Sequence, residues 1–146
     1  MPTHAEQKIL PYSPEQMFDL VADVGRYPQF LPWCVAARIR SRDETKLVAD
    51  LIIGFKGLHE SFTSLVSLDK ANLIIDVKYE NGPFNYLNNK WVFQDYDIGS
   101  CRLDFYVDFE FKSRLLQGVM GFLFNEAVRR MVGAFEQRAK ALYGAA

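Results

Sequence analysis

The stretch LLQGVMGFLFNEAVRRMVGAFEQRAKALY, residues 115–143, decides the fold. Apolar residues recur in it every three or four positions, which is the spacing that places side chains on one face of an α-helix. The spacing therefore predicts one helix over 115–143, about 40 Å long at roughly 1.5 Å per residue. The expected buried stripe consists of Leu116, Met120, Leu123, Ala127, Met131, Phe135, Ala139 and Leu142.

The first half of this helix carries more apolar surface than one stripe needs. Within 115–124 only Gln117 is polar, so Val119 and Phe122 add apolar surface beside the stripe. Two interpretations are open: this half is simply buried more deeply, or it walls a cavity for an apolar ligand or touches a membrane. The uncharged run ends at Glu126, short of the roughly 20 apolar residues that a spanning helix requires.

Length and charge indicate one domain, 1–146, with no strong overall field. The chain of 146 residues has a formal net charge of -1, which does not favour DNA or an anionic membrane as a partner. Cys34 and Cys101 lack metal-ligand spacing and are expected to be free thiols. Residues 1–8 include Glu6 and no apolar core of a signal peptide, so we expect a cytoplasmic protein that contacts the inner membrane only peripherally.

The chain before the long helix begins with a strand and a capped helix. Residues 3–10 fit a strand, and Ser13, Pro14 and Gln16 form the signature of a helix start with a capping box. Gly25 is placed to end that helix. The segment YPQFLPWC, 27–34, contains two prolines, so we expect a short irregular or helical segment there.

After residue 34 the apolar period changes from helical to two, which is typical of strands. In the last of these segments, Leu103 to Phe111 alternate with polar residues, so one face is dry and one is wet. Short turns predict an antiparallel sheet, and the long helix is the one element with enough apolar surface to cover it. We expect an α+β fold in which a curved sheet of about seven strands surrounds the helix and leaves an apolar cavity. The expected strands after the first are 35–42, 47–55, 59–68, 73–79, 86–94 and 102–111.

The element order, YPQFLPWC, GPFNYLNNKWVF (82–93) and DFEF (108–111) together resemble one family. The chain is similar to the START-like ubiquinone (coenzyme Q)-binding proteins, which are grouped with polyketide cyclases and dehydrases and include the bacterial ribosome-association toxins. The resemblance covers nearly the whole chain. It implies a helix-grip (START/Bet v 1-like) fold, with one or two short helices after the first strand, around an apolar tunnel.

The resemblance implies two different functions. In the quinone-binding branch, the Leu31–Cys34 element belongs to the ligand-binding region, and the protein chaperones coenzyme Q for respiration or ubiquinone biosynthesis. In the toxin branch, the protein blocks the joining of ribosomal subunits. Trp33 before Cys34 is more similar to the quinone branch.

We therefore expect a single lipid-binding domain that holds ubiquinone, with part of the tail leaving through a mouth that contacts the inner membrane or respiratory complexes. The mouth is expected near Phe30, Leu31, Trp33, Phe55 and Leu58. The alternative interpretation is that these side chains only close the core. The expected ligand-binding residues are Tyr27, Phe30, Leu31, Pro32, Trp33, Phe55, Leu58, Trp91, Phe105, Val119, Phe122 and Leu123.

Enzymatic chemistry has little support in the sequence. Asp104 and Asp108 fall on the wet side of their strand, and neither His4 nor His59 has an evident partner for activating a nucleophile. We expect no catalytic residue, no metal and no required cofactor, with ubiquinone as a bound ligand. A polyketide cyclase-like reaction is the least favoured alternative.

A ribosome contact would require basic side chains that reach RNA phosphates or ribosomal proteins. Arg38, Arg40 and Arg42 fall in phase on one side of a strand, and Arg129 with Arg130 would extend this basic stripe. The plainer interpretation is a solvated face of the sheet.

Overall fold

The computed structural model describes residues 3–31, 33–55, 58–80 and 82–144. Its elements, in chain order, are β1 (Thr3–Leu10), α1 (Pro14–Ala22), the 3-10 helix η1 (Val24–Gln29), β2 (Cys34–Arg42), β3 (Lys46–Phe55), β4 (Leu58–Asp69), β5 (Ile74–Tyr79), β6 (Phe84–Asp95), β7 (Cys101–Phe111) and α2 (Arg114–Tyr143).

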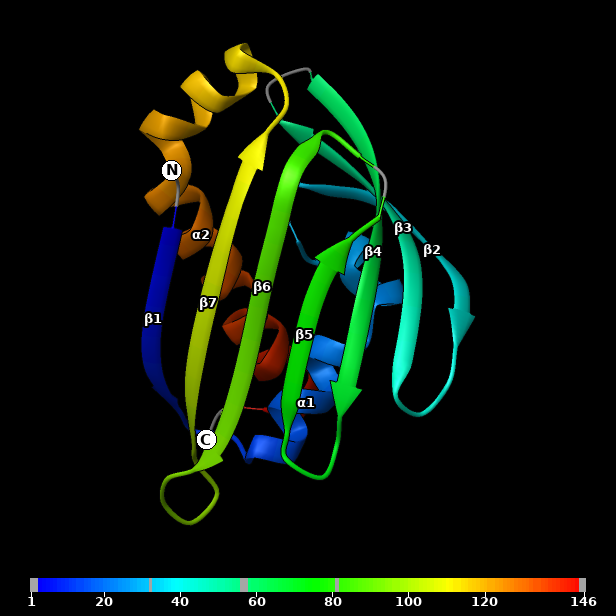
Figure 1. Ribbon diagram of the computed structural model, residues 1–146. Coiled ribbons are helices and arrows are strands. Elements are labelled where there is room, and N and C mark those ends of the chain that lie inside the picture. Colours follow the sequence, from blue (N-terminus) through cyan, green and yellow to red (C-terminus); the bar gives the residue numbers. More distant parts are fainter. Residues whose placement is uncertain (1–2, 32, 56–57, 81, 145–146) are drawn as a thin grey trace.

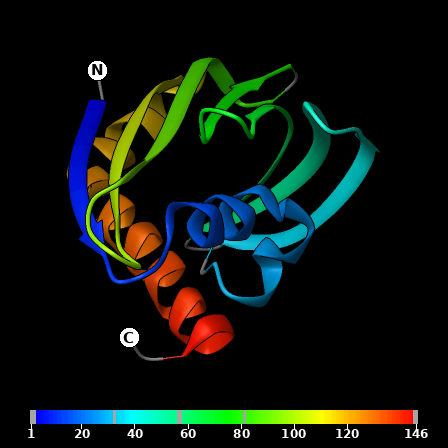
Figure 2. The same ribbon diagram turned by 90° about the horizontal axis from the view of Figure 1, so that it is seen from below.

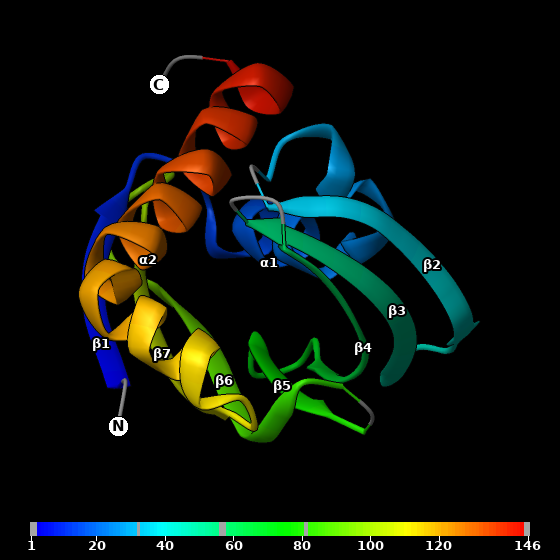
Figure 3. The same ribbon diagram turned by 90° about the horizontal axis from the view of Figure 1, so that it is seen from above.

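The strands form one antiparallel sheet in the order β1-β7-β6-β5-β4-β3-β2. Both α-helices lie on the same side of this sheet, as Figure 1 shows. Seen from above, the sheet curves so that β2 and β3 turn towards the side that holds the helices (Figure 3). The predicted α+β helix-grip fold with seven strands and a long C-terminal helix is therefore confirmed.

The second half of α2 supplies the central packing surface of the fold. Val128, Val132, Phe135 and Ala139 are buried at helical spacing, as expected for an amphipathic helix. The prediction was wrong for Leu142, which is 50% exposed. The C-terminal end of α2 extends past the sheet in Figure 2, and its last turn packs on the start of α1 through Tyr143, whose hydroxyl donates to the carbonyl of Gln16 at 3.0 Å. No helix in the described part of the chain is long and apolar enough to cross a membrane.

The start of α1 was predicted correctly and its end was not. The Ser13 hydroxyl accepts a hydrogen bond from the backbone N–H of Gln16 at 3.1 Å, and the Gln16 side chain accepts from the Ser13 N–H at 3.0 Å. Gly25 does not end the helix, because α1 stops at Ala22 and the chain continues as η1. A Cβ at Gly25 would lie 3.6 Å from Cγ1 of Ile39 on β2, which is an ordinary van der Waals contact.

A β-bulge in β2 breaks the predicted basic stripe. Ile39 pairs with Ala49 and Ser41 pairs with Val48, so Arg40 is an extra residue in the ladder. After the bulge the alternation shifts, and Arg42 pairs with Leu47, whose side chain is buried on the concave face. The prediction that Arg42 shares a face with the two preceding arginines was therefore wrong.

Candidate ligand-binding site

A row of aromatic rings joins η1 to the sheet through α2. Phe135 of α2 lies at its middle, with ring centroids 5.2 Å from Phe30, 5.4 Å from Tyr27 and 5.0 Å from Trp91. Trp91 in turn lies 4.7 Å from Phe105 of β7. The contacts are edge-to-face, which is a favourable arrangement for aromatic pairs. This row packs α2 against η1 on one side and against β6 and β7 on the other.

A second aromatic cluster lies at the other end of the strands. Phe84 of β6 is its centre, and the four rings around it lie 5.0 to 5.7 Å away, centroid to centroid. The N–H of Phe111 donates to Oε1 of Gln117 at 2.9 Å, which fixes the first turn of α2 to this cluster. The four rings belong to Phe62, Tyr79, Phe109 and Phe111.

The concave face between the two clusters is apolar but incompletely covered. Val77 of β5 and Leu87 of β6 are half-buried although they sit in the middle of this face. Their neighbours Ile75 and Trp91 are 1% and 3% exposed. Apolar side chains in the centre of a closed core are normally buried completely. The half-buried pair therefore marks an apolar part of the concave face that the described residues leave partly open.

The Tyr27 hydroxyl and the Cys34 thiol near η1 are held neutral. Burial raises the pKa of the Tyr27 hydroxyl, which donates to the carbonyl of Val21, and the Cys34 thiol nearby adds to this rise. Burial also raises the pKa of the Cys34 thiol to about 11. Both groups stay protonated at neutral pH, and the charges at this end come from Asp23, Arg26 and Arg138.

Several predicted ligand-binding residues gather beside η1 and β3. Tyr27, Phe30 and Leu31 are half-buried and pack against the core. Trp33 is half-buried as well, and its carbonyl accepts a hydrogen bond from the N–H of Gly54 at 2.8 Å, which places it beside the β3–β4 hairpin.

The other predicted residues fall into two groups. Trp91 and Phe105 are buried within the aromatic row, at 3% and 2% exposure. Pro32 lies outside the described residues. The side chains of Phe55, Leu58, Val119, Phe122 and Leu123 also lie outside them, and the described backbone places Phe55 opposite Leu58 where β3 meets β4.

Two polar groups on the concave face were not predicted from the sequence. Asn89 accepts a hydrogen bond from the indole N–H of Trp91 at 2.8 Å, although its position in the alternating strand is an apolar one. A polar residue at an apolar position of the alternation was the sequence signal for Asn89. His4 lies in β1 with its Nε2 3.8 Å from a carboxylate oxygen of Glu6, which is an acidic neighbour and not a nucleophile.

The charged residues lie mainly on the convex face. Asp104 pairs with Arg102 at 3.4 Å on that side, as the alternation predicted. A groove of about 400 Å³ there is lined by Arg38, Arg40 and Asp50 among others. Hydrogen bonds from Arg40, at 2.6 Å, and from Thr63 hold the pKa of the Asp50 carboxyl below its usual value. On α2, Arg130 pairs with Glu126 and Arg129 is exposed.

In the part of the chain that the structure describes, no group of three or more His, Cys, Asp or Glu side chains gathers where it could hold a metal ion. A curved antiparallel sheet that grips one long C-terminal helix defines a START-type domain. The chain belongs to the family described as "Polyketide cyclase / dehydrase and lipid transport", whose model matches residues 10–136.

Individual relatives carry two kinds of name. A protein of Rickettsia prowazekii named ribosome association toxin RatA is 43% identical over 136 residues, which cover 91% of this chain and 92% of that protein. The Xenopus laevis mitochondrial coenzyme Q-binding protein COQ10 homolog B is 38% identical over 97% of this chain and 59% of its own length. A START superfamily protein from Mycobacterium smegmatis has the same fold, with a TM-score of 0.82, 20% identity and coverage of 96% and 98%.

Proposed function

We propose that this chain binds ubiquinone, or a related isoprenoid quinone, between the concave face of the sheet and α2. The supporting observation is the half-buried apolar centre of that face, at Val77 and Leu87, between two closed aromatic clusters. Each CH₂ group of a tail buried there gains about 0.8 kcal/mol. The name of the Xenopus relative agrees with this class of ligand.

In this proposal the chain is a carrier, not an enzyme. It supports respiratory electron transport or ubiquinone biosynthesis, and it needs no cofactor because the redox chemistry belongs to the quinone and its partner enzymes. The tail leaves beside Leu31 and Trp33, where both side chains are half-buried at the edge of the core. The same edge makes the transient contact with the inner membrane surface or with respiratory complexes.

The test is mass spectrometry of the organic extract of the protein after purification from a ubiquinone-producing bacterium. The variant with Leu31→Lys and Trp33→Ala changes the mouth, and Leu65→Lys is the matched control on the convex face, where Leu65 is 37% exposed. Thermal melting shows that both variants are folded. We expect stoichiometric quinone in the natural chain and the control, and little in the mouth variant. No bound lipid, together with no uptake from quinone-loaded vesicles, would contradict the proposal.

A second candidate is interference with the joining of ribosomal subunits, and the observation that favours it is the name of the Rickettsia relative. The structure leaves Arg38 on the convex face and Arg129 on α2 as exposed cations for such a contact, since Arg40 is engaged by Asp50. We expect added protein to increase free subunits in a sucrose gradient, and expect the variant with Arg38→Glu and Arg129→Glu to lose this effect. Unchanged gradients at high protein excess would exclude this candidate.

A further inference from the structure

Asn89 is a polar residue in the apolar centre of the concave face. It pairs with Val77 on β5 and with Val107 on β7, and its side chain is half-buried. The alternation of β6 puts it on the same face as Leu87 and Trp91. A polar amide in such a place needs hydrogen-bond partners, because an unpaired one costs free energy.

The hydrogen bonds of Asn89 fix the orientation of its amide. The indole N–H of Trp91 can only donate, and it lies 2.8 Å from Oδ1. The carbonyl of Tyr106 can only accept, and it lies 2.8 Å from Nδ2. The amide therefore cannot turn over. Its NH₂ group carries two hydrogens, and within the described residues the carbonyl of Tyr106 accounts for one of them.

We propose that the second N–H of Asn89 donates a hydrogen bond to a ring carbonyl of the bound quinone, and so selects ligands that carry a carbonyl oxygen. The inference rests on the proposed function and names the residue that recognises the ring. The ring then lies against Val77 and Leu87, which are the half-buried side chains next to Asn89. An apolar hollow without this donor would bind any chain of suitable shape.

The position of Asn89 also gives the ligand a direction. From β6 to β3 the ligand crosses three strand spacings, roughly 14 Å at about 4.8 Å each, and it also runs along the strands, because Asn89 is in register, through Val77 and Val66, with Leu47 of β3 and not with Gly54. The tail therefore runs from Asn89 across β5 and β4 to the edge at Trp33, whose carbonyl is bonded to Gly54 of β3. The ring lies inside and the rest of the tail emerges at the mouth.

The test compares two probes with the same decyl tail. One is decylubiquinone, and the other is an aromatic analogue that keeps the methoxy groups and has methyl groups in place of both carbonyl oxygens. Affinities are measured by isothermal titration calorimetry for the natural chain, Asn89→Asp and Asn89→Leu. Asn89→Asp keeps an acceptor for Trp91 and removes the donors, whereas Asn89→Leu introduces no charge, so one variant remains informative if the other fails to fold.

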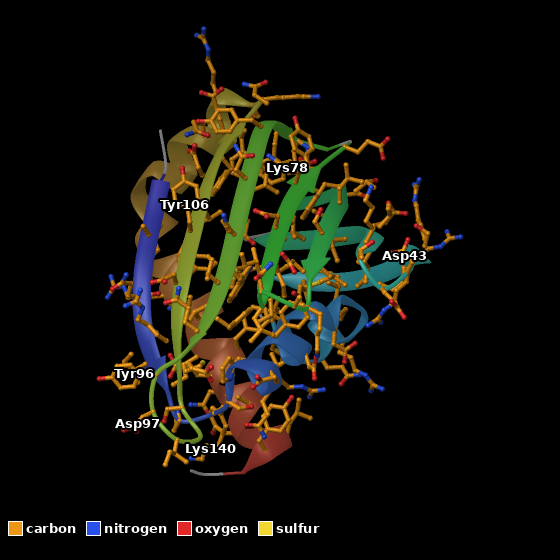
Figure 4. The ribbon with its side chains drawn as sticks, turned by 60° about the horizontal axis from the view of Figure 1, so that its bottom comes forward. Asp43, Lys78, Tyr96, Asp97, Tyr106 and Lys140 are labelled. Atoms are coloured by element: carbon orange, nitrogen blue, oxygen red, sulfur yellow. The ribbon has the colours of Figure 1, made fainter. Side chains whose placement is uncertain are left out.

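The matched control is Asn88→Leu, one residue away on the convex face. The Asn88 side chain accepts a hydrogen bond from Nζ of Lys78 at 3.1 Å. Figure 4 labels Lys78, which lies on β5, and Tyr106, which lies on β7. This substitution removes the same amide from the same strand without changing the concave face.

We expect the natural chain and Asn88→Leu to prefer decylubiquinone about tenfold, and both Asn89 variants to lose that preference. If Asn89 only holds Trp91 in place, its substitution weakens the binding of both probes equally and leaves the ratio of their affinities unchanged. That result would overturn the inference. Equal affinities of the natural chain for the two probes would also overturn the inference, although binding itself would still support the proposed function. If the natural chain binds neither probe, the proposed function fails and the inference fails with it.

Discussion

Arg138 of α2 lies over the ring of Phe30, with its guanidinium carbon 5.3 Å from the ring centroid. The same guanidinium donates a hydrogen bond to Oε1 of Gln29 at 3.0 Å. One cation therefore joins the last helix to the end of η1, beside the residues that we place at the mouth. The contact fixes α2 and η1 relative to each other.

Replacing Arg138 with Leu should lower the free energy of unfolding by about 1 kcal/mol, because a cation–π contact contributes about 0.5–1 kcal/mol and a hydrogen bond is lost with it. Urea denaturation measures this change. Arg130→Leu is the control, since the pair of Arg130 with Glu126 is an exposed i,i+4 contact worth about 0.3–0.5 kcal/mol. Equal effects of the two substitutions would show that the contact with Phe30 adds nothing.

Phe135→Ala should be one of the most damaging substitutions in the chain. The side chain is 2% exposed and touches the rings of Tyr27, Phe30 and Trp91. Its removal leaves a cavity in the middle of the aromatic row and should cost about 3–5 kcal/mol in urea denaturation. Leu142→Ala, in the same helix at a half-exposed site, should change stability by less than about 0.5 kcal/mol. A loss below about 1 kcal/mol for Phe135→Ala would mean that the row is not a structural centre.

Gly82→Ala should destabilise the fold through a direct clash. A Cβ at Gly82 would lie 2.4 Å from Cβ of Phe62, and 3.1 Å from its Cα. Relieving this overlap requires movement of β4 and should cost about 1–3 kcal/mol. Gly99→Ala separates the clash from backbone strain, because Gly99 has a φ of +74° but nothing within 4 Å of a new Cβ. The expectation fails if the two substitutions have the same melting temperature.

Alkaline pH should destabilise the protein through its two buried thiols. Burial raises the pKa of Cys34 to about 11, and burial raises that of Cys101 to about 11 as well. Between about pH 9 and pH 11 the unfolded chain loses these protons while the folded chain keeps them, so stability falls as pH rises. Melting temperatures across this range measure the effect, and the variant with both cysteines changed to Ala should show a shallower decline. An unchanged slope in that variant would assign the decline to other groups.

The sequence predicted the parts of the fold that depend on local patterns. Most of the strands follow from apolar alternation, which is poor in 59–68, and the start of α1 follows from Ser13 and Gln16 in a capping box. The bulge at Arg40 could not be predicted, because the alternation of β2 continues through it and only the pairing with β3 reveals the extra residue.

The candidate site was predicted less completely than the fold. The segment that holds Tyr27, Phe30 and Trp33 was expected to bind the ligand from the family resemblance and from its aromatics, and it lies beside the aromatic row. The function of Asn89 depends on Trp91 beside it and on a carbonyl of the next strand, neither of which a one-dimensional pattern reports. The same holds for Phe135, whose contacts come from η1 and β6.

The pairing of β1 with β7 determines when the structure can form during translation. Thr3 lies opposite Asp108, so the first strand to leave the ribosome has no partner until nearly all the other strands have been synthesised. Strands β2 to β7 can pair as successive hairpins while β1 waits. α2 follows β7 along the chain, and its ion pair between Glu136 and Lys8 ties it back to β1. A nascent chain therefore keeps its concave apolar face uncovered until its last thirty or so residues have emerged, which is the stage at which it most needs protection from aggregation.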